Sequence, residues 1–194
     1  MNNKEAHAHA RLKFCISGAA ETGVCSADAL DKAKELGHEI AARGAILING
    51  ATTGFPYWAA IGAKEAGGFT IGISPASSEK EHAETFGLPI DYLDMIIYTG
   101  YGYSGRNLLL TRTADAVIIG CGRMGTLNEF TVAFEDGKPI GVLAGTGGTT
   151  NMLENIIATS GRAKDNPNII FENDPKTLLD KLTLLVNKNK HTDR

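Results

Sequence analysis

Short apolar segments alternate along the chain with amphipathic stretches, and this pattern predicts an α/β fold. Short, continuously apolar runs are typical of strands buried on both faces, and they occupy residues 12–17, 45–50, 70–74, 95–99, 116–120, 139–144 and 168–171. The stretches between them predict helices over residues 26–43, 55–66, 78–86, 104–114, 125–136 and 150–160, and from 174 onward. Because strands separated by helices imply right-handed crossovers, we predict a Rossmann-like, doubly wound, mostly parallel sheet of about seven strands with helices on both faces.

Capping residues indicate where several of these helices begin and end. Ser26 is the expected N-cap of the helix over 26–43, and Gly44 follows its end. Gly137 ends the helix over 125–136. In the last helix Asp174 caps the start and Pro175 takes the first helical position, where a missing N–H costs nothing.

The length of 194 residues fits one domain better than two. We expect a flexible arm over 1–11, a single nucleotide-binding domain over 12–187 and a frayed tail over 188–194. His7 and His9 are metal-ligand types, but their polar surroundings favour a frayed arm. No metal site is predicted.

Charge and composition exclude several classes of partner. The net charge is -3 and no dense cluster of Lys and Arg is present, so nucleic acid is an unlikely partner. The apolar runs are too short to span a bilayer, which predicts a cytoplasmic protein with no membrane partner. The three cysteines, Cys15, Cys25 and Cys121, are odd in number and lack metal-type spacing, which fits a reducing cytosol better than a disulfide framework. Cys121 lies near a helix N-terminus and is either a reactive thiol or a small buried side chain.

Three glycine-rich loops follow predicted strands at residues 17–23, 49–56 and 120–126. In an open parallel sheet such loops meet at the carboxyl ends of the strands, where ligands bind. Free amides and helix N-termini there can hold a phosphate. Glycine in any one loop is also explained by its turn, and Thr52 and Thr53 either contact a phosphate or cap the next helix. The three loops together favour a phosphate or nucleotide site, with candidates Ser17, Gly18, Gly50, Thr52, Thr53, Gly54, Gly122, Arg123, Met124, Gly125 and Thr126.

A charged pair is predicted beside these loops. Arg106 lies at the start of the helix over 104–114, and Glu129 lies near the start of the helix over 125–136. A glutamate there can be a simple helix-start residue. Facing Arg106 across the ligand site, it instead forms an arginine–carboxylate pair that can hold a phosphate, a ribose or a developing charge.

The segment "GRNLLLTRTADAVIIGCGRMGTLNEF" resembles the signature of the Lonely Guy (LOG) family, which belongs with DprA-like proteins to the SLOG group of Rossmann-like nucleotide-binding proteins. In that signature an arginine begins the helix, an Ala-Asp pair ends it, and Pro-Gly-Gly-x-Gly-Thr-x-x-Glu follows. The matching positions here are Arg106, Asp115, Gly122, Gly125, Thr126 and Glu129. The resemblance implies hydrolysis of the N-glycosidic bond of a nucleoside 5′-monophosphate, with Arg106 and Glu129 catalytic and the glycine-threonine loop on the phosphate.

The sequence departs from this signature at Cys121, Arg123, Asn107 and Asn128, and in its second loop. These departures resemble the branch of the superfamily that includes molybdenum-cofactor carrier proteins, so the resemblance leaves two functions open: a phosphoribohydrolase, or a binding or carrier protein without turnover. It implies no required cofactor, a bound nucleotide or phosphate, with Asn107 among its contacts, and a homodimer or homotetramer. Single-stranded DNA binding is disfavoured by the acidic balance.

Two further features leave alternatives open. Arg123 either adds a charge for a more anionic ligand or points outward. The tyrosines Tyr98, Tyr101 and Tyr103 either stack on a base or pterin or are ordinary loop and core aromatics.

Overall fold

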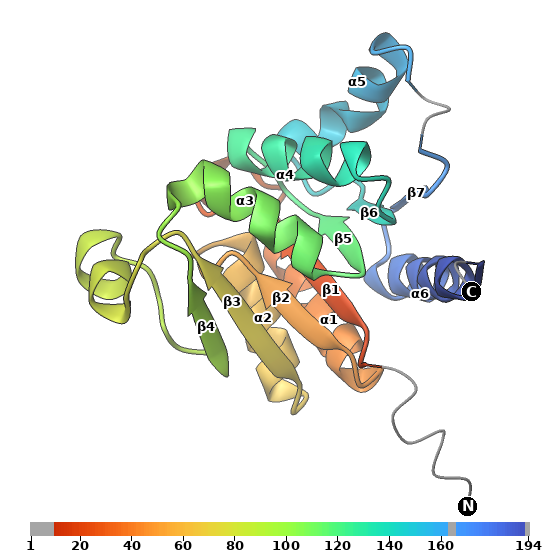
Figure 1. The fold of residues 1–194 in the computed structure, drawn as a ribbon. Helices are drawn as coiled ribbons and strands as arrows, with labels where there is room; N and C mark the ends of the chain where they lie inside the picture. The colour runs from red at the N-terminus through yellow and green to blue at the C-terminus, as the bar shows by residue number, and fades with distance from the viewer. Residues whose placement is uncertain (1–9, 163–165, 193–194) are drawn as a thin grey trace, which may run out of the picture.

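The computed structural model describes residues 10–162 and 166–192 and shows a seven-stranded, entirely parallel sheet (Figure 1). The strand order is β4-β3-β2-β1-β5-β6-β7. The strands are β1 (Lys13–Ser17), β2 (Ile46–Asn49), β3 (Phe69–Ser74), β4 (Met95–Tyr98), β5 (Ala116–Ile119), β6 (Ile140–Leu143) and β7 (Ile169–Glu172). Each lies within, or within one residue of, a predicted apolar run, and the predicted Rossmann-like fold is confirmed.

Helices connect the strands. They are α1 (Ala29–Ala42), α2 (Phe55–Glu65), α3 (Gly102–Thr113), α4 (Met124–Glu135), α5 (Leu153–Thr159) and α6 (Pro175–Thr192), with short turns η1 (Thr22–Val24), η2 (Glu81–Thr85) and η3 (Thr149–Met152). The N-cap prediction for α1 was wrong, because Asp28 precedes the helix and the Ser26 hydroxyl donates to its carboxylate at 2.7 Å. The helix predicted over 150–160 is divided into η3 and α5, and the one predicted over 78–86 is a single π-helical turn, η2.

The chain ends differ in part from the predicted boundaries. Arg11, placed in the arm by the sequence, donates to the carbonyls of Gly44 and Ala45, at 2.6 Å and 3.2 Å. Helix α6 continues through residues 188–192, which the sequence assigned to the tail. Residues 1–9, with the two N-terminal histidines, and 193–194 lie outside the described residues. Asp174 caps α6 as predicted, because its carboxylate accepts from the backbone N–H of Thr177 at 2.8 Å.

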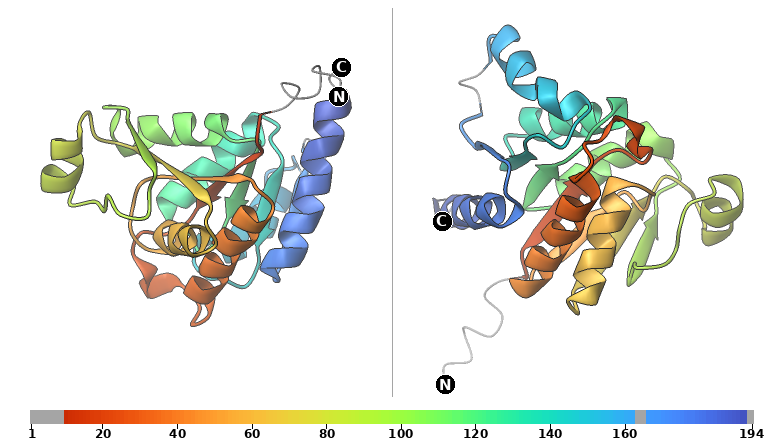
Figure 2. Two further views of the ribbon diagram at one scale, coloured as in Figure 1. Left: turned by 90° about the horizontal axis from the view of Figure 1, so that it is seen from below. Right: turned by 180° about the vertical axis from the view of Figure 1, so that it is seen from behind.

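Two helical layers cover the sheet. Helices α1, α2 and α6 pack on one face, and α3 and α4 pack on the other, where α5 joins them through Leu153 (Figure 2). Alternate strand residues enter the two cores: Phe14 and Ile16 lie in the cluster under α1, whereas Cys15 lies in the cluster under α4. This alternation explains why the central strands β1, β2, β5 and β6 are apolar on both faces, since both faces are buried, whereas the edge strand β4 exposes Met95 and Ile97.

The strand order changes direction between β1 and β5. From β1 the chain builds outward through β2 and β3 to β4, then crosses back through α3 to β5 on the other side of β1 and continues to β7. The loops after β1 and β5 therefore diverge and leave a crevice at their carboxyl ends, the usual ligand position in such sheets. Among the described residues, no helix has the length and apolar character needed to cross a membrane.

Candidate functional site

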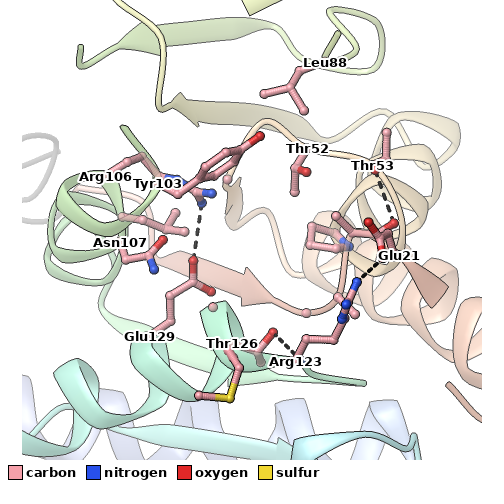
Figure 3. Close-up of a pocket in the computed structure, with 18 of the residues that line it drawn as sticks. Glu21, Thr52, Thr53, Leu88, Tyr103, Arg106, Asn107, Arg123, Thr126 and Glu129 are labelled. Carbon is pink, nitrogen blue, oxygen red and sulfur yellow. Dashed lines mark hydrogen bonds and ion pairs between the residues drawn. The ribbon is translucent and has the colours of Figure 1, made fainter. Parts of the chain in front are cut away.

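A cavity of about 600 Å³ lies at this crevice (Figure 3). Its walls come from the loops after β1, β2 and β5, from the first turns of α3 and α4, and from the segment 86–88 that precedes β4. The volume is within the range of sites that hold small-molecule ligands.

Most of the predicted site residues line this cavity. They are Gly18, Gly50, Thr52, Thr53, Arg106, Asn107, Arg123, Met124, Gly125, Thr126 and Glu129. Neither threonine of the second loop caps α2, because Gly54 occupies the N-cap position. Thr53 instead donates to the carbonyl of Ala20 at 3.2 Å, which joins the first and second loops.

Three predicted contacts, Ser17, Gly54 and Gly122, are absent from the cavity wall. Ser17 lies behind Glu129 and donates to its carboxylate. Gly54 has a φ of 71° and packs so closely that an added Cβ would lie 2.2 Å from the carbonyl oxygen of Ala19. Gly122 accepts a hydrogen bond from Thr149 N at 2.9 Å, which turns it toward the loop after β6. These residues shape the loops around the cavity and do not form its wall.

Arg106 and Glu129 face each other across the base of the cavity, as predicted. Arg106 extends from α3 and Glu129 from α4, and Nη1 of the arginine lies 3.4 Å from Oε1 of the glutamate (Figure 3). The residues are 5% and 6% exposed. We call them the inner pair. Because a buried charge without a partner is costly, each side chain holds the other in place.

Glu129 is further held by two polar neighbours. Ser17 Oγ donates to Oε2, and the Asn107 amide lies beside Oε1, with its nitrogen 2.8 Å from that oxygen in the orientation that also satisfies the carbonyl of Tyr103. Burial raises the pKa of the Glu129 carboxyl, while Arg106 and the Ser17 hydrogen bond offset part of this effect. A carboxyl with a raised pKa can exchange a proton closer to neutral pH than an exposed glutamate does.

Gly50 makes room for the arginine. A Cβ at this position would lie 1.9 Å from Arg106 Nη1, so no larger residue fits while the guanidinium keeps its place. The ring of Tyr103 lies on another side, with its centroid 5.9 Å from the guanidinium carbon. Nε of Arg106 is buried and has no hydrogen-bond partner in the described part of the chain. Arg106 lines the cavity, and its guanidinium keeps this buried donor unused among the described residues.

The N-terminus of α4 also faces the cavity. Met124, Gly125 and Thr126 form its first turn and line the wall, and the N–H groups of a first helical turn have no partner within the helix. Thr126 Oγ1 accepts from the backbone N–H of Arg123 at 3.3 Å, which orders this turn. Together with the helix dipole, these groups favour an anion.

A second ion pair lies at the opposite side of the cavity and involves a residue that the sequence did not identify. Nη1 of Arg123 pairs with a carboxylate oxygen of Glu21 from the loop after β1 (Figure 3). Their side chains are 52% and 80% exposed, so we call them the outer pair. Arg123 thus lines the cavity, and the only sequence signal for its partner was an acid within a glycine-rich loop.

Aromatic and apolar residues form another wall. Phe86, Gly87 and Leu88 line the cavity together with Tyr103, whose ring centroid lies 5.6 Å from that of Phe86. No motif marks residues 86–88, which reach the site only because the chain between β3 and β4 folds back over it. Tyr98 packs against His82, and Tyr101 is 70% exposed and absent from the wall.

The cysteine interpretation was wrong, because Cys25 and Cys121 form a disulfide with a Cα–Cα distance of 5.4 Å. Cys121 is therefore neither a reactive nor a free buried thiol; Cys15 is the buried free cysteine. The bond joins the loop after β1 to the loop after β5, beside a backbone hydrogen bond from Ala19 N to Cys121 O at 2.6 Å. In the described ranges no group of three His, Cys, Asp or Glu side chains could hold a metal ion.

The model of the SLOG cluster4 family matches residues 11–179. The chain belongs to this family. The SLOG membership indicated by the segment from Arg106 to Glu129 is thus confirmed. An uncharacterized protein of Archaeoglobus fulgidus is 31% identical over 132 residues, which cover 68% of this chain and 82% of that protein.

Solved structures similar to this SLOG cluster4 chain include two whose names state a ligand. The molybdenum cofactor binding protein of Rippkaea orientalis is 27% identical, with a TM-score of 0.72 and coverage of 93% of this chain and 98% of that one. The molybdenum cofactor carrier protein of Chlamydomonas reinhardtii is 27% identical, with a TM-score of 0.71 and coverage of 91% and 99%. These likenesses support small-ligand binding on this fold.

Proposed function

We propose that the cavity binds a small phosphorylated ligand of the nucleotide or pterin type. One observation carries this proposal: the buried guanidinium of Arg106, with an unused Nε donor, shares the cavity with the N-terminus of α4. An anion at the helix end would share the cavity with this guanidinium, whose positive charge favours it.

The aromatic wall supports a ligand with a planar ring. Tyr103 and Phe86 lie on the cavity side away from the outer pair. A ligand whose phosphate binds at the N-terminus of α4 can therefore place its base or pterin ring against these two side chains. The two related structures named for the molybdenum cofactor favour a phosphorylated pterin as cargo. In this proposal the inner pair orients the ligand and no bond is broken.

Glycosidic hydrolysis is the second candidate, and the environment of Glu129 favours it. Its carboxyl lines the cavity, has a raised pKa and is fixed by Ser17. Such a group can supply a proton to a departing base or orient the attacking water as positive charge develops on the sugar. In a carrier the same carboxyl would face the cargo without breaking a bond.

Binding is tested by calorimetry and thermal shift with AMP, adenosine and inorganic phosphate. We expect AMP to bind and to raise the melting temperature by more than adenosine does, because only AMP offers a phosphate to α4. Arg106→Lys and Thr126→Val should each weaken AMP binding by about tenfold. Arg112→Gln, which removes an exposed arginine paired with Asp136, is the matched control and should change nothing. If neither AMP nor a phosphorylated pterin binds, the proposal is wrong.

Turnover distinguishes the two candidates. Nucleoside monophosphates are incubated with the protein and the mixture is separated by chromatography for free base. Base release that Glu129→Gln abolishes, with AMP still bound, supports the hydrolase. Binding by the wild type without base release supports the carrier.

A further inference from the structure

Two arginine–carboxylate pairs border the same cavity, one buried and the other exposed to solvent. The inner pair is almost completely enclosed, with side chains 6% and 8% exposed, whereas the side chains of the outer pair are 52% and 80% exposed. Figure 3 shows the two pairs on different sides of the same space, each joined by a dashed line. The same chemistry in two environments implies two different roles.

An exposed ion pair is weak and exchangeable. Water screens Glu21 and Arg123, and the pair holds two long side chains in one arrangement for little gain in free energy. A phosphate offers a guanidinium two parallel, charge-assisted hydrogen bonds and carries more charge than a carboxylate. A phosphate within reach of Arg123 should therefore replace the Glu21 carboxylate as its partner.

Arg123 is placed to make this exchange. It is the N-cap residue of α4, directly before the helical turn that faces the cavity, and its side chain lines the cavity wall. Its backbone is fixed by the hydrogen bond to Thr126 and by a bond from Thr149 Oγ1 to its carbonyl at 3.2 Å. The loop that carries Glu21 is tied to the loop before α4 by the disulfide, so only the two side chains have to move.

We propose that Arg123 is a specificity-determining residue that exchanges Glu21 for the phosphate of the ligand. This inference rests on the proposed phosphate site and adds to it a competition: Glu21 neutralises Arg123 in the free protein and is released when a phosphate binds. A ligand without a phosphate leaves the outer pair intact and gains nothing from Arg123. Arg123 therefore selects for a phosphorylated ligand, and Glu21 lowers the affinity for it by competing for the same guanidinium.

A double-mutant cycle on AMP binding tests the exchange. Glu21→Gln should raise AMP affinity about threefold to tenfold, because Arg123 is then free before binding, and Arg123→Gln should lower it about tenfold. In the double variant the gain from Glu21→Gln should disappear, leaving an affinity close to that of Arg123→Gln alone. Adenosine binding should not change in any of the three variants.

The exposed pair of Arg112 and Asp136, which is absent from the cavity wall, supplies a matched control cycle. Arg112→Gln, Asp136→Asn and their combination change the net charge by the same amounts and should leave AMP affinity unaltered. Such a control separates exchange at the site from a change in overall charge.

The other outcomes overturn the inference. Equal gains from Glu21→Gln with and without Arg123 would mean simple repulsion between Glu21 and the phosphate. A loss of affinity in Glu21→Gln would make Glu21 a direct ligand contact. If the wild type binds neither AMP nor a phosphorylated pterin, the proposed phosphate site fails together with this inference, whereas binding with an additive cycle refutes the exchange alone.

Discussion

The disulfide between Cys25 and Cys121 leads to a quantitative prediction about stability. The perturbation is reduction of the wild-type chain by a small dithiol, which breaks the crosslink and leaves the composition unchanged. The hydrogen bonds beside it, from Ala19 N to Cys121 O and from Ser26 N to Thr146 O, do not depend on the sulfur bond. We therefore expect the reduced chain to keep its fold with a smaller free energy of unfolding.

The magnitude follows from the length of chain that the bond closes. The two cysteines are 96 residues apart. Chain-entropy arguments assign about 4.7 kcal/mol to a closed loop of about 100 residues, and measured values commonly lie between about 2 and 4 kcal/mol because unfolded chains retain structure. We expect reduction to lower the free energy of unfolding by about 2–4 kcal/mol.

Urea unfolding is the assay, followed by the fluorescence of Trp58, the single tryptophan. Oxidised and reduced samples are compared at equal protein concentration, and the shift in midpoint is converted with the slope of each transition. The double variant Cys25→Ala/Cys121→Ala is the control and should unfold at the same midpoint with and without the dithiol. Its stability should be close to that of the reduced wild type.

Thiol counting decides whether the reasoning holds. In denaturant without reductant the oxidised chain should expose one reactive thiol, Cys15, and after reduction it should expose three. Three thiols in the unreduced, denatured chain would refute the disulfide. One thiol combined with identical urea midpoints would refute the entropic argument while leaving the bond itself in place.

Three further predictions concern single residues. Gly50→Ala should displace the Arg106 guanidinium and lower AMP affinity more than tenfold. Gly23→Ala is the control, because an added Cβ there meets nothing within 4 Å, and it should leave the affinity unchanged. Calorimetry compares the two variants. Burial raises the pKa of the Glu129 carboxyl. In chemical denaturation the wild type should therefore lose stability relative to Glu129→Gln as the pH rises from 4 through that pKa. A difference in unfolding free energy between the two proteins that stays constant with pH would contradict this. Burial alone would raise the pKa of Asp115, but two lysines and a backbone N–H lower it. Asp115→Asn should therefore lower the free energy of unfolding by about 1–3 kcal/mol in urea at neutral pH. This loss should disappear as the pH falls through the lowered pKa.

The hydrophobic pattern predicted the fold because its central strands are buried on both faces. Residues such as Phe14 and Cys15 enter different cores, so the run is apolar at every position and its length alone identifies a strand. Helix starts were less certain, as α1 shows. Ser26 is a good capping residue by type, but its hydroxyl bonds to Asp28 and the helix begins later.

The inner pair was predictable because its two residues lie on consecutive helices, joined by a single strand. Arg106 on α3, the strand β5 and Glu129 on α4 follow one another in the chain, and β5 sets both helices on the same face of the sheet. The segment 86–88 was not predictable in this way. It enters the site through the return of the chain between β3 and β4, and neither periodicity nor a motif encodes that return.

The disulfide and the outer pair were missed for one shared reason, which the strand order makes plain. Cys25 and Glu21 follow β1, whereas Cys121 and Arg123 follow β5, and the two strands are far apart in sequence but neighbours in the sheet. Cysteine spacing along the chain carries no trace of this adjacency. A strand order inferred first would have placed the two loops together and made both pairings testable from sequence.

The same adjacency gives a common explanation for two departures from the LOG signature. Cys121 stands where that signature has proline and Arg123 where it has glycine, and each finds its partner within the single loop after β1. A change to cysteine or arginine in the β5 loop alone would leave a free thiol or an uncompensated cation at the site, so the two loops are best understood as having changed together. Related chains with cysteine at the position of Cys121 should then carry a second cysteine after β1, and chains with arginine at the position of Arg123 should carry an acid there. An arginine that recurs without the acid would show that Arg123 works without Glu21, and it would remove the basis for the exchange.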